Sequence, residues 1–111
     1  MAYDPVLAER IRDELASQPD IIERKMFGGL AFLLRGHMTA VASGQGGLMI
    51  RADPDQSEAL VQSTPAEFAV MRGKQMKGWL RLDSAAIEDE LELTAWIERS
   101  VDYASTLPPK R

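Results

Sequence analysis

The clearest pattern in this sequence is a central stretch, residues 23–53, in which short apolar runs alternate with glycine-containing turns. Within it, residues 30–34 are apolar at both alternating sets of positions, so this strand is predicted to be covered on both faces or to lie at an interface. The pair Gly28-Gly29 permits a tight turn or bulge that side chains would obstruct. We predict a meander of four strands over residues 21–27, 30–34, 37–42 and 48–52.

Helical patterns precede and follow this meander. Aspartates suit the capping position before a helix, proline suits the first helical position, and apolar residues then recur at helical spacing. In the last of these segments, Trp96 falls on the apolar stripe and is predicted to pack on the sheet. The predicted helices begin at Asp4-Pro5, at Asp53 or Asp55, and at Asp89, and the last two end near Gln62 and Thr106.

Between the second and third helices, residues 76–82 are predicted to form a strand that contains Trp79, whereas residues 66–72 fit either a strand or a turn. Strands joined by short turns favour antiparallel pairing. The predicted class is therefore α+β, an antiparallel sheet packed against helices in the rough order α-β(3-4)-α-β(2)-α. Residues 1–107 are expected to form one domain and residues 108–111 a frayed tail.

The composition excludes several functional classes. The chain contains no cysteine, which removes disulfides, cysteine-ligated zinc and thiol nucleophiles from consideration. The first residues lack the pattern of a signal peptide, and no apolar run approaches the roughly 20 residues that span a bilayer. A cytoplasmic protein without a membrane segment is expected.

Charge is distributed unevenly in this acidic chain, whose net charge is -4. Acids gather in the predicted helices, whereas residues 24–52 and 72–82 each carry four basic residues and no acid. If the two groups of strands form one sheet, some of these bases could converge on a binding face; a solvated sheet face explains the same distribution. The acidic total argues against direct nucleic-acid binding. The candidate binding residues are Arg24, Lys25, Arg51, Lys74, Lys77 and Arg81.

The sequence contains no recognisable constellation for catalysis, metal or cofactor binding. His37 is the only histidine, and a zinc site needs about three or four protein ligands. The glycine-rich residues 44–47 lack the spacing of phosphate-binding loops and are interpreted as a hairpin loop. The pair Asp53 and Asp55 is explained by helix capping. Six methionines fit either gap-filling in the core or an adaptable binding surface.

Several motifs resemble the N-terminal domain of the TfoX/Sxy competence-regulator family. They are the run from Glu23 to Phe32 with R-K-M-F-G-G at its centre, Gly36-His37-Met38, Leu48 to Arg51, Gly73-Lys74 with Met76 and Trp79, and Trp96-Ile97. The resemblance implies an α+β domain and a link to natural competence, in which full-length members act with a cyclic-AMP receptor protein as transcription co-regulators. It supplies no catalytic residues, and a stand-alone domain without the family's C-terminal domain is expected.

The leading hypothesis is a non-enzymatic protein-binding or regulatory module that binds a protein partner or a second copy of itself. An open apolar patch on the sheet, edged by basic side chains such as Lys25, Arg51, Lys74 and Lys77, is its expected surface. One alternative is a small enzyme or small-molecule-binding domain with a carboxylate and lysine site. Another is nucleic-acid binding through a basic sheet face. The residues expected to be structural are Gly28, Gly29, Trp79 and Trp96.

Overall fold

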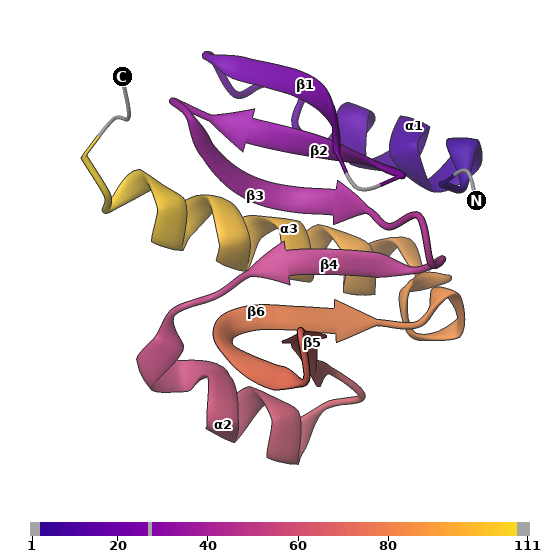
Figure 1. Cartoon of the computed structure of the whole chain (residues 1–111). Coiled ribbons are helices and arrows are strands. Elements are labelled where there is room, and N and C mark those ends of the chain that lie inside the picture. The colour runs from indigo at the N-terminus through magenta and orange to yellow at the C-terminus, as the bar shows by residue number, and fades with distance from the viewer. Residues whose placement is uncertain (1–2, 27, 109–111) are drawn as a thin grey trace.

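The computed structural model describes residues 3–26 and 28–108. Six strands in this part of the chain form one antiparallel sheet in the order β1-β2-β3-β4-β6-β5 (Figure 1). The elements are α1 (Pro5–Glu14), β1 (Ile21–Met26), β2 (Gly29–Leu34), β3 (His37–Ala42), β4 (Leu48–Arg51), α2 (Pro54–Ser63), β5 (Glu67–Met71), β6 (Lys74–Leu82), the 3-10 helix η1 (Ser84–Ile87) and α3 (Glu90–Ser105). The predicted α+β class and order of elements are confirmed.

The structure differs from the predicted elements at several element ends, in one ambiguous segment and by one additional short helix. The ambiguous residues 66–72 contain the edge strand β5, and its partner β6 begins at Lys74, two residues before the predicted strand. The short helix η1 was not predicted. Phe27, placed at the end of the first predicted strand, lies outside the described residues.

The three α-helices begin at the predicted aspartates. The Asp4 carboxylate accepts hydrogen bonds from the backbone N–H groups of Val6 and Leu7, at 2.9 and 3.4 Å. Asp53 and Asp89 each accept one such bond at 2.9 Å, two residues into the following helix. These bonds satisfy backbone donors that have no partner within a helix, so the sequence fixes where each helix starts.

Helices α1 and α3 cover one face of the sheet, and α2 packs beside β6 and β5 (Figure 1). The main core fills the space between this face and the helices, and its largest fully buried side chains include Trp96, Phe32 and Ile50. Trp96 is 1% exposed, which confirms that it points inward. In α2 the buried position is Ser57, a polar residue, whereas Ala59 is exposed.

The pairing of β2 with β3 shifts register between Phe32 and Leu33. Two hydrogen bonds near this shift connect the two strands to each other and to α3. The Thr39 hydroxyl donates to the Phe32 carbonyl at 2.9 Å, and the Ser100 hydroxyl of α3 donates to the Thr39 carbonyl at 2.6 Å. Both side chains are completely buried. Since buried polar groups cost stability when unpaired, the bond from Ser100 helps to fix where α3 crosses β3, and the bond from Thr39 holds the irregular pairing of β2 with β3.

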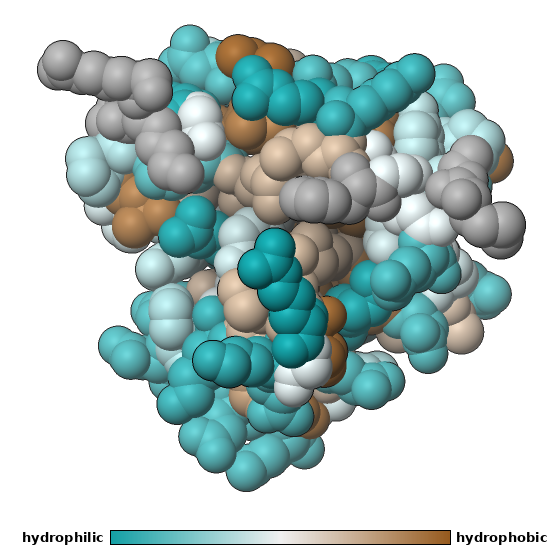
Figure 2. All heavy atoms as spheres, viewed as in Figure 1, coloured by the Kyte–Doolittle hydropathy of each residue, from teal (hydrophilic) through white to brown (hydrophobic). Residues whose placement is uncertain are grey.

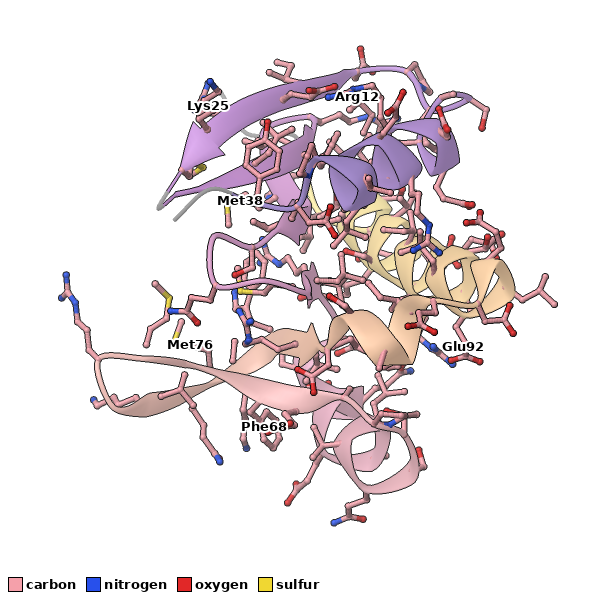
Figure 3. The ribbon with its side chains drawn as sticks, turned by 90° about the vertical axis from the view of Figure 1, so that its right-hand side faces the viewer. Arg12, Lys25, Met38, Phe68, Met76 and Glu92 are labelled. Atoms are coloured by element: carbon pink, nitrogen blue, oxygen red, sulfur yellow. The ribbon has the colours of Figure 1, made fainter. Side chains whose placement is uncertain are left out.

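The β5–β6 hairpin bends away from the rest of the sheet near Gly78. Gly78 has a φ of 88°, its N–H donates to the Ser57 hydroxyl at 3.1 Å, and its carbonyl accepts from the Ala52 N–H at 2.8 Å. The pairing of β5 with β6 shifts register at this level. In Figure 3 the hairpin, which carries the labelled Met76, projects away from the helices.

The β1–β2 turn confirms the prediction for its two glycines. Gly28 has a φ of 77°, in the left-handed region that favours glycine. A Cβ on Gly29 would lie 2.6 Å from the carbonyl oxygen of Ala42 on the neighbouring strand.

The end of the described chain lies against the start of β3. His37 is 7% exposed, and its Nε2 lies 2.6 Å from the carbonyl oxygen of Pro108, a residue placed in the predicted tail. The remaining tail residues lie outside the described part. No helix in the described residues is long and apolar enough to cross a membrane.

Candidate functional site

The face of the sheet opposite α1 and α3 carries a second apolar cluster, separate from the main core. Its buried members are Ala31, Leu33 and Val41. Three partly buried methionines, Met26, Met38 and Met49, pack against them. Figure 2 shows this face, with apolar residues gathered in a central hollow and hydrophilic residues around it.

Strand alternation and register explain why these side chains meet. Val41 of β3 pairs with Ala31 of β2 and with Met49 of β4, so all three point to the same side of the sheet. Met38 pairs with Leu33, and Met26 with Gly29. The three strand methionines therefore occupy one face of the sheet, because each pairs across the strands with a position on that face.

The bent β5–β6 hairpin turns this face into a groove. A cavity of about 260 Å³ lies between the apolar cluster and the hairpin. The hairpin contributes Met71 and Arg72, and the β3–β4 loop contributes residues 43–45. We call this feature the methionine groove, defined by Met26, Met38, Met49 and Met71 over a floor of Ala31 and Val41.

Arginine is the charged residue type that lines the groove in the described part of the chain. Arg72 lies exposed at the hairpin turn. Arg81 donates from Nη1 to the Ser43 hydroxyl at 3.1 Å and from Nη2 to the Gly46 carbonyl at 2.8 Å, so its guanidinium also holds the β3–β4 loop. Among the described residues that line the groove there is no carboxylate, although the chain as a whole is acidic.

The six basic residues singled out from the sequence do not form one patch. Arg81 lines the groove, and Arg24 pairs with Ala31 of its floor. Lys25 pairs with Leu30, whose side chain belongs to the core on the helical side.

The other three of these bases lie further along the chain. The Arg51 guanidinium lies over the rings of Trp79 and Tyr103, with its carbon 5.5 and 5.7 Å from their centroids. Lys74 and Lys77 are exposed on β6, and Lys74 pairs with Met71. Alternation along a strand separates Lys25 from Arg24, and the contact with Tyr103 of α3 holds Arg51 away from the groove lining.

Sequence reasoning missed Arg72 as a site residue, and it considered Met71 only as one of the six methionines. Both fall in the segment that fitted either a strand or a turn, and both enter the groove because the hairpin bends. The methionines fitted either gap-filling in the core or an adaptable binding surface, and the sequence did not decide between the two. Their alternate positions would have indicated a shared face once the register was known.

A second cavity, of about 300 Å³, lies between α2 and α3. Its charged lining residues are Asp53, Arg99 and Asp102. The carboxyl group with a clearly shifted pKa is elsewhere: the hydrogen bonds and positive charge of Arg12 lower the pKa of Glu23, on the helical side of β1. Among the described residues, no three His, Cys, Asp or Glu side chains are grouped to hold a metal ion.

An antiparallel sheet with helices on one face and an apolar groove on the other defines a small α+β domain. Residues 13–104 of the chain match the family model of the TfoX N-terminal domain. The chain belongs to this family. A search of curated proteins gives no match.

Proposed function

We propose that this chain is a non-enzymatic protein-binding module with a regulatory role in the cytoplasm, and that the methionine groove binds an apolar segment of a protein partner. The observation that carries the proposal is the convergence of four methionines on one concave face. Methionine side chains are flexible and polarisable, and they are common on surfaces that adapt to partners. Membership of the TfoX N-terminal domain family supports a role in transcription or competence regulation.

Exposed apolar side chains extend the groove at its borders. Val70 and Met71 of the hairpin are 59% and 46% exposed. Ile22, 55% exposed, pairs with Leu33 and so faces the same side of the sheet. Apolar surface that continues outside a groove in this way is typical of protein interaction sites.

The size of the groove also favours a segment of a protein over a small molecule. Its volume of about 260 Å³ lies below the range of roughly 300–1,000 Å³ typical of small-molecule sites. A few apolar side chains of a partner would fill it, while the rest of the partner contacts the rim.

The proposal can be tested by site-specific photo-crosslinking in cells. A photoreactive residue at position 71 should crosslink a defined protein, whereas the same residue at position 91, an exposed leucine at the start of α3, should not. The captured protein, once purified, should bind the unmodified chain at least about tenfold more tightly than Met71→Glu. Leu91→Glu, an apolar-to-acid change at an exposed position away from the groove, should bind as the wild type does.

Equal binding of the captured protein to Met71→Glu and to the wild type would contradict the proposal. The groove could instead be occupied by a second copy of the chain. Sedimentation at micromolar concentration in low and high salt distinguishes this outcome. A homodimer that Met71→Glu dissociates would replace the partner in our proposal.

A further inference from the structure

The charges around the methionine groove indicate which kind of partner segment it binds. This inference rests on the proposal that the groove is the binding surface. Arg72 and Arg81 line the groove. Arg24 and Lys74 pair with the groove residues Ala31 and Met71, and so lie on the same side of their strands. Among the described strand residues on this side, the acid is Glu67, which pairs with the groove residue Arg81.

This basic border stands out because the chain carries a net charge of -4. A non-specific solvated surface of such a chain would be acidic on average. The local excess of arginine and lysine beside apolar floor residues therefore complements a partner that carries carboxylates next to its apolar side chains.

A nucleic acid fits this surface less well. Binding of single strands combines a basic groove with aromatic side chains on which bases stack. The described floor of this groove is built from methionine, alanine and valine side chains, which favour aliphatic or aromatic side chains of a peptide.

We infer that the methionine groove binds an acidic apolar segment, in which large apolar side chains enter the groove and flanking carboxylates meet Arg72, Arg81, Arg24 and Lys74. The apolar contacts supply most of the affinity, and the charges select the partner and speed its association. Arg72 is the base best placed to test this, because it is exposed at the hairpin turn.

The chain offers a matched control for Arg72. Arg72 and Arg35 both have positive φ, 54° and 52°, and each precedes a glycine at a hairpin turn. Arg35 lies in the β2–β3 turn and is not part of the groove lining. Arg72→Glu and Arg35→Glu therefore make the same charge change in the same backbone conformation.

The experiment measures fluorescence anisotropy with four labelled probes. One is a short peptide with a central leucine–phenylalanine pair flanked by glutamates. In the second, lysines replace the glutamates; in the third, serines replace the apolar pair; the fourth is a single-stranded oligonucleotide. The wild type should bind the acidic apolar peptide most tightly and more weakly at high salt.

Charge reversal at Arg72 should then exchange the preference between the acidic peptide and the lysine peptide. Arg72→Glu should weaken binding of the acidic peptide about fivefold or more and strengthen binding of the lysine peptide, whereas Arg35→Glu should change either by less than about twofold. Equal binding of the acidic and lysine peptides, or tightest binding of the oligonucleotide, would overturn the inference. If the acidic and lysine peptides bind equally and the serine peptide does not bind, the proposed protein-binding function would still stand. A different result refutes the proposed protein-binding function itself, namely that Met71→Glu leaves binding of the crosslinked partner unchanged.

Discussion

At the residue scale, the two glycines of the β1–β2 turn are required for different reasons. Gly28 supplies a backbone conformation, with a φ of 77°, that side chains with a Cβ rarely adopt. Gly29 supplies space, because a Cβ there would meet the Ala42 carbonyl oxygen at 2.6 Å. A backbone atom in a sheet cannot move aside as a flexible side chain could.

Valine at either glycine should therefore destabilise the fold. We expect Gly28→Val and Gly29→Val each to lower the free energy of unfolding by more than about 1 kcal/mol, measured by urea denaturation. Glu67→Val, an exposed change on an edge strand where valine is well suited, serves as the control. Unchanged urea midpoints for both glycine variants would refute the interpretation.

The ion pair between α1 and β1 predicts a dependence of stability on pH. Arg12 Nε and Nη2 donate to the Glu23 carboxylate at 2.6 and 2.8 Å, which lowers the pKa of Glu23 and raises that of Arg12. A carboxylate with a lowered pKa in the folded state stabilises the protein above its unfolded pKa, about 4.3, and loses this contribution as the pH falls through the folded value.

Glu23→Gln should thus be less stable than the wild type near pH 7, and the difference should shrink as the pH falls below about 4. Thermal melts from neutral to acidic pH measure this. The effect is small because both side chains are partly exposed. A difference that stays constant or grows in acid would show that the pair does not contribute in this way.

At the scale of elements, α3 is the helix that organises the core. Its stripe of Leu93, Trp96, Ile97 and Ala104 is buried against the sheet, and Ser100 fixes the crossing by its bond to Thr39. Trp96 is the largest of these side chains and is almost fully buried.

Truncating the tryptophan should show how much stability α3 contributes. We expect Trp96→Ala to cost about 3–5 kcal/mol, a large part of the stability of a domain of this size. Leu91→Ala, at a 78% exposed position of the same helix, should change the free energy of unfolding by less than about 0.5 kcal/mol. A small effect of the tryptophan change in chemical denaturation would contradict its role as an anchor.

The hairpin bend depends on a serine that sequence patterns did not indicate. Ser57 is fully buried, and its hydroxyl donates to the Asp53 carbonyl at 3.0 Å and accepts from Gly78 N–H at 3.1 Å. Ser57→Ala leaves the Gly78 N–H buried without a partner and should cost about 1–3 kcal/mol in urea denaturation. Ser63→Ala, at an exposed position of the same helix, should be close to neutral, and equal effects of the two changes would refute this role of Ser57.

At the scale of the whole molecule, the sequence determines the elements more clearly than the groove. The aspartate caps and the helical spacing of apolar residues are local signals, and they correctly place the three α-helices. The groove instead depends on the register of several strands and on the bend at Gly78. The apolar positions Phe68, Val70 and Met71 showed no clear alternation, so the segment of β5 was left open between a strand and a turn, and its part in the groove could not be predicted.

The dispersal of the basic residues has a related cause. Arg24 and Lys25 are neighbours in the sequence, yet alternation in β1 sends them to opposite sides. Which side is covered by helices depends on contacts between segments distant in the chain. Arg51 lies over Trp79 and Tyr103, a contact that joins β4, β6 and α3 and that no local pattern records.

The order of strands in the sheet has a consequence for folding. β1, β2 and β3 each pair with the next strand along the chain, and β5 pairs with β6, whereas the β4–β6 pairing must close across α2 and β5. Local hairpins form faster than pairings that need a longer loop closed, so the chain should assemble as two blocks that join last at β4 and β6. Native-state hydrogen exchange should then show the β5–β6 amides opening together at lower free energy than those of β2 and β3. The wall of the groove would thus be the part of the sheet that opens most readily.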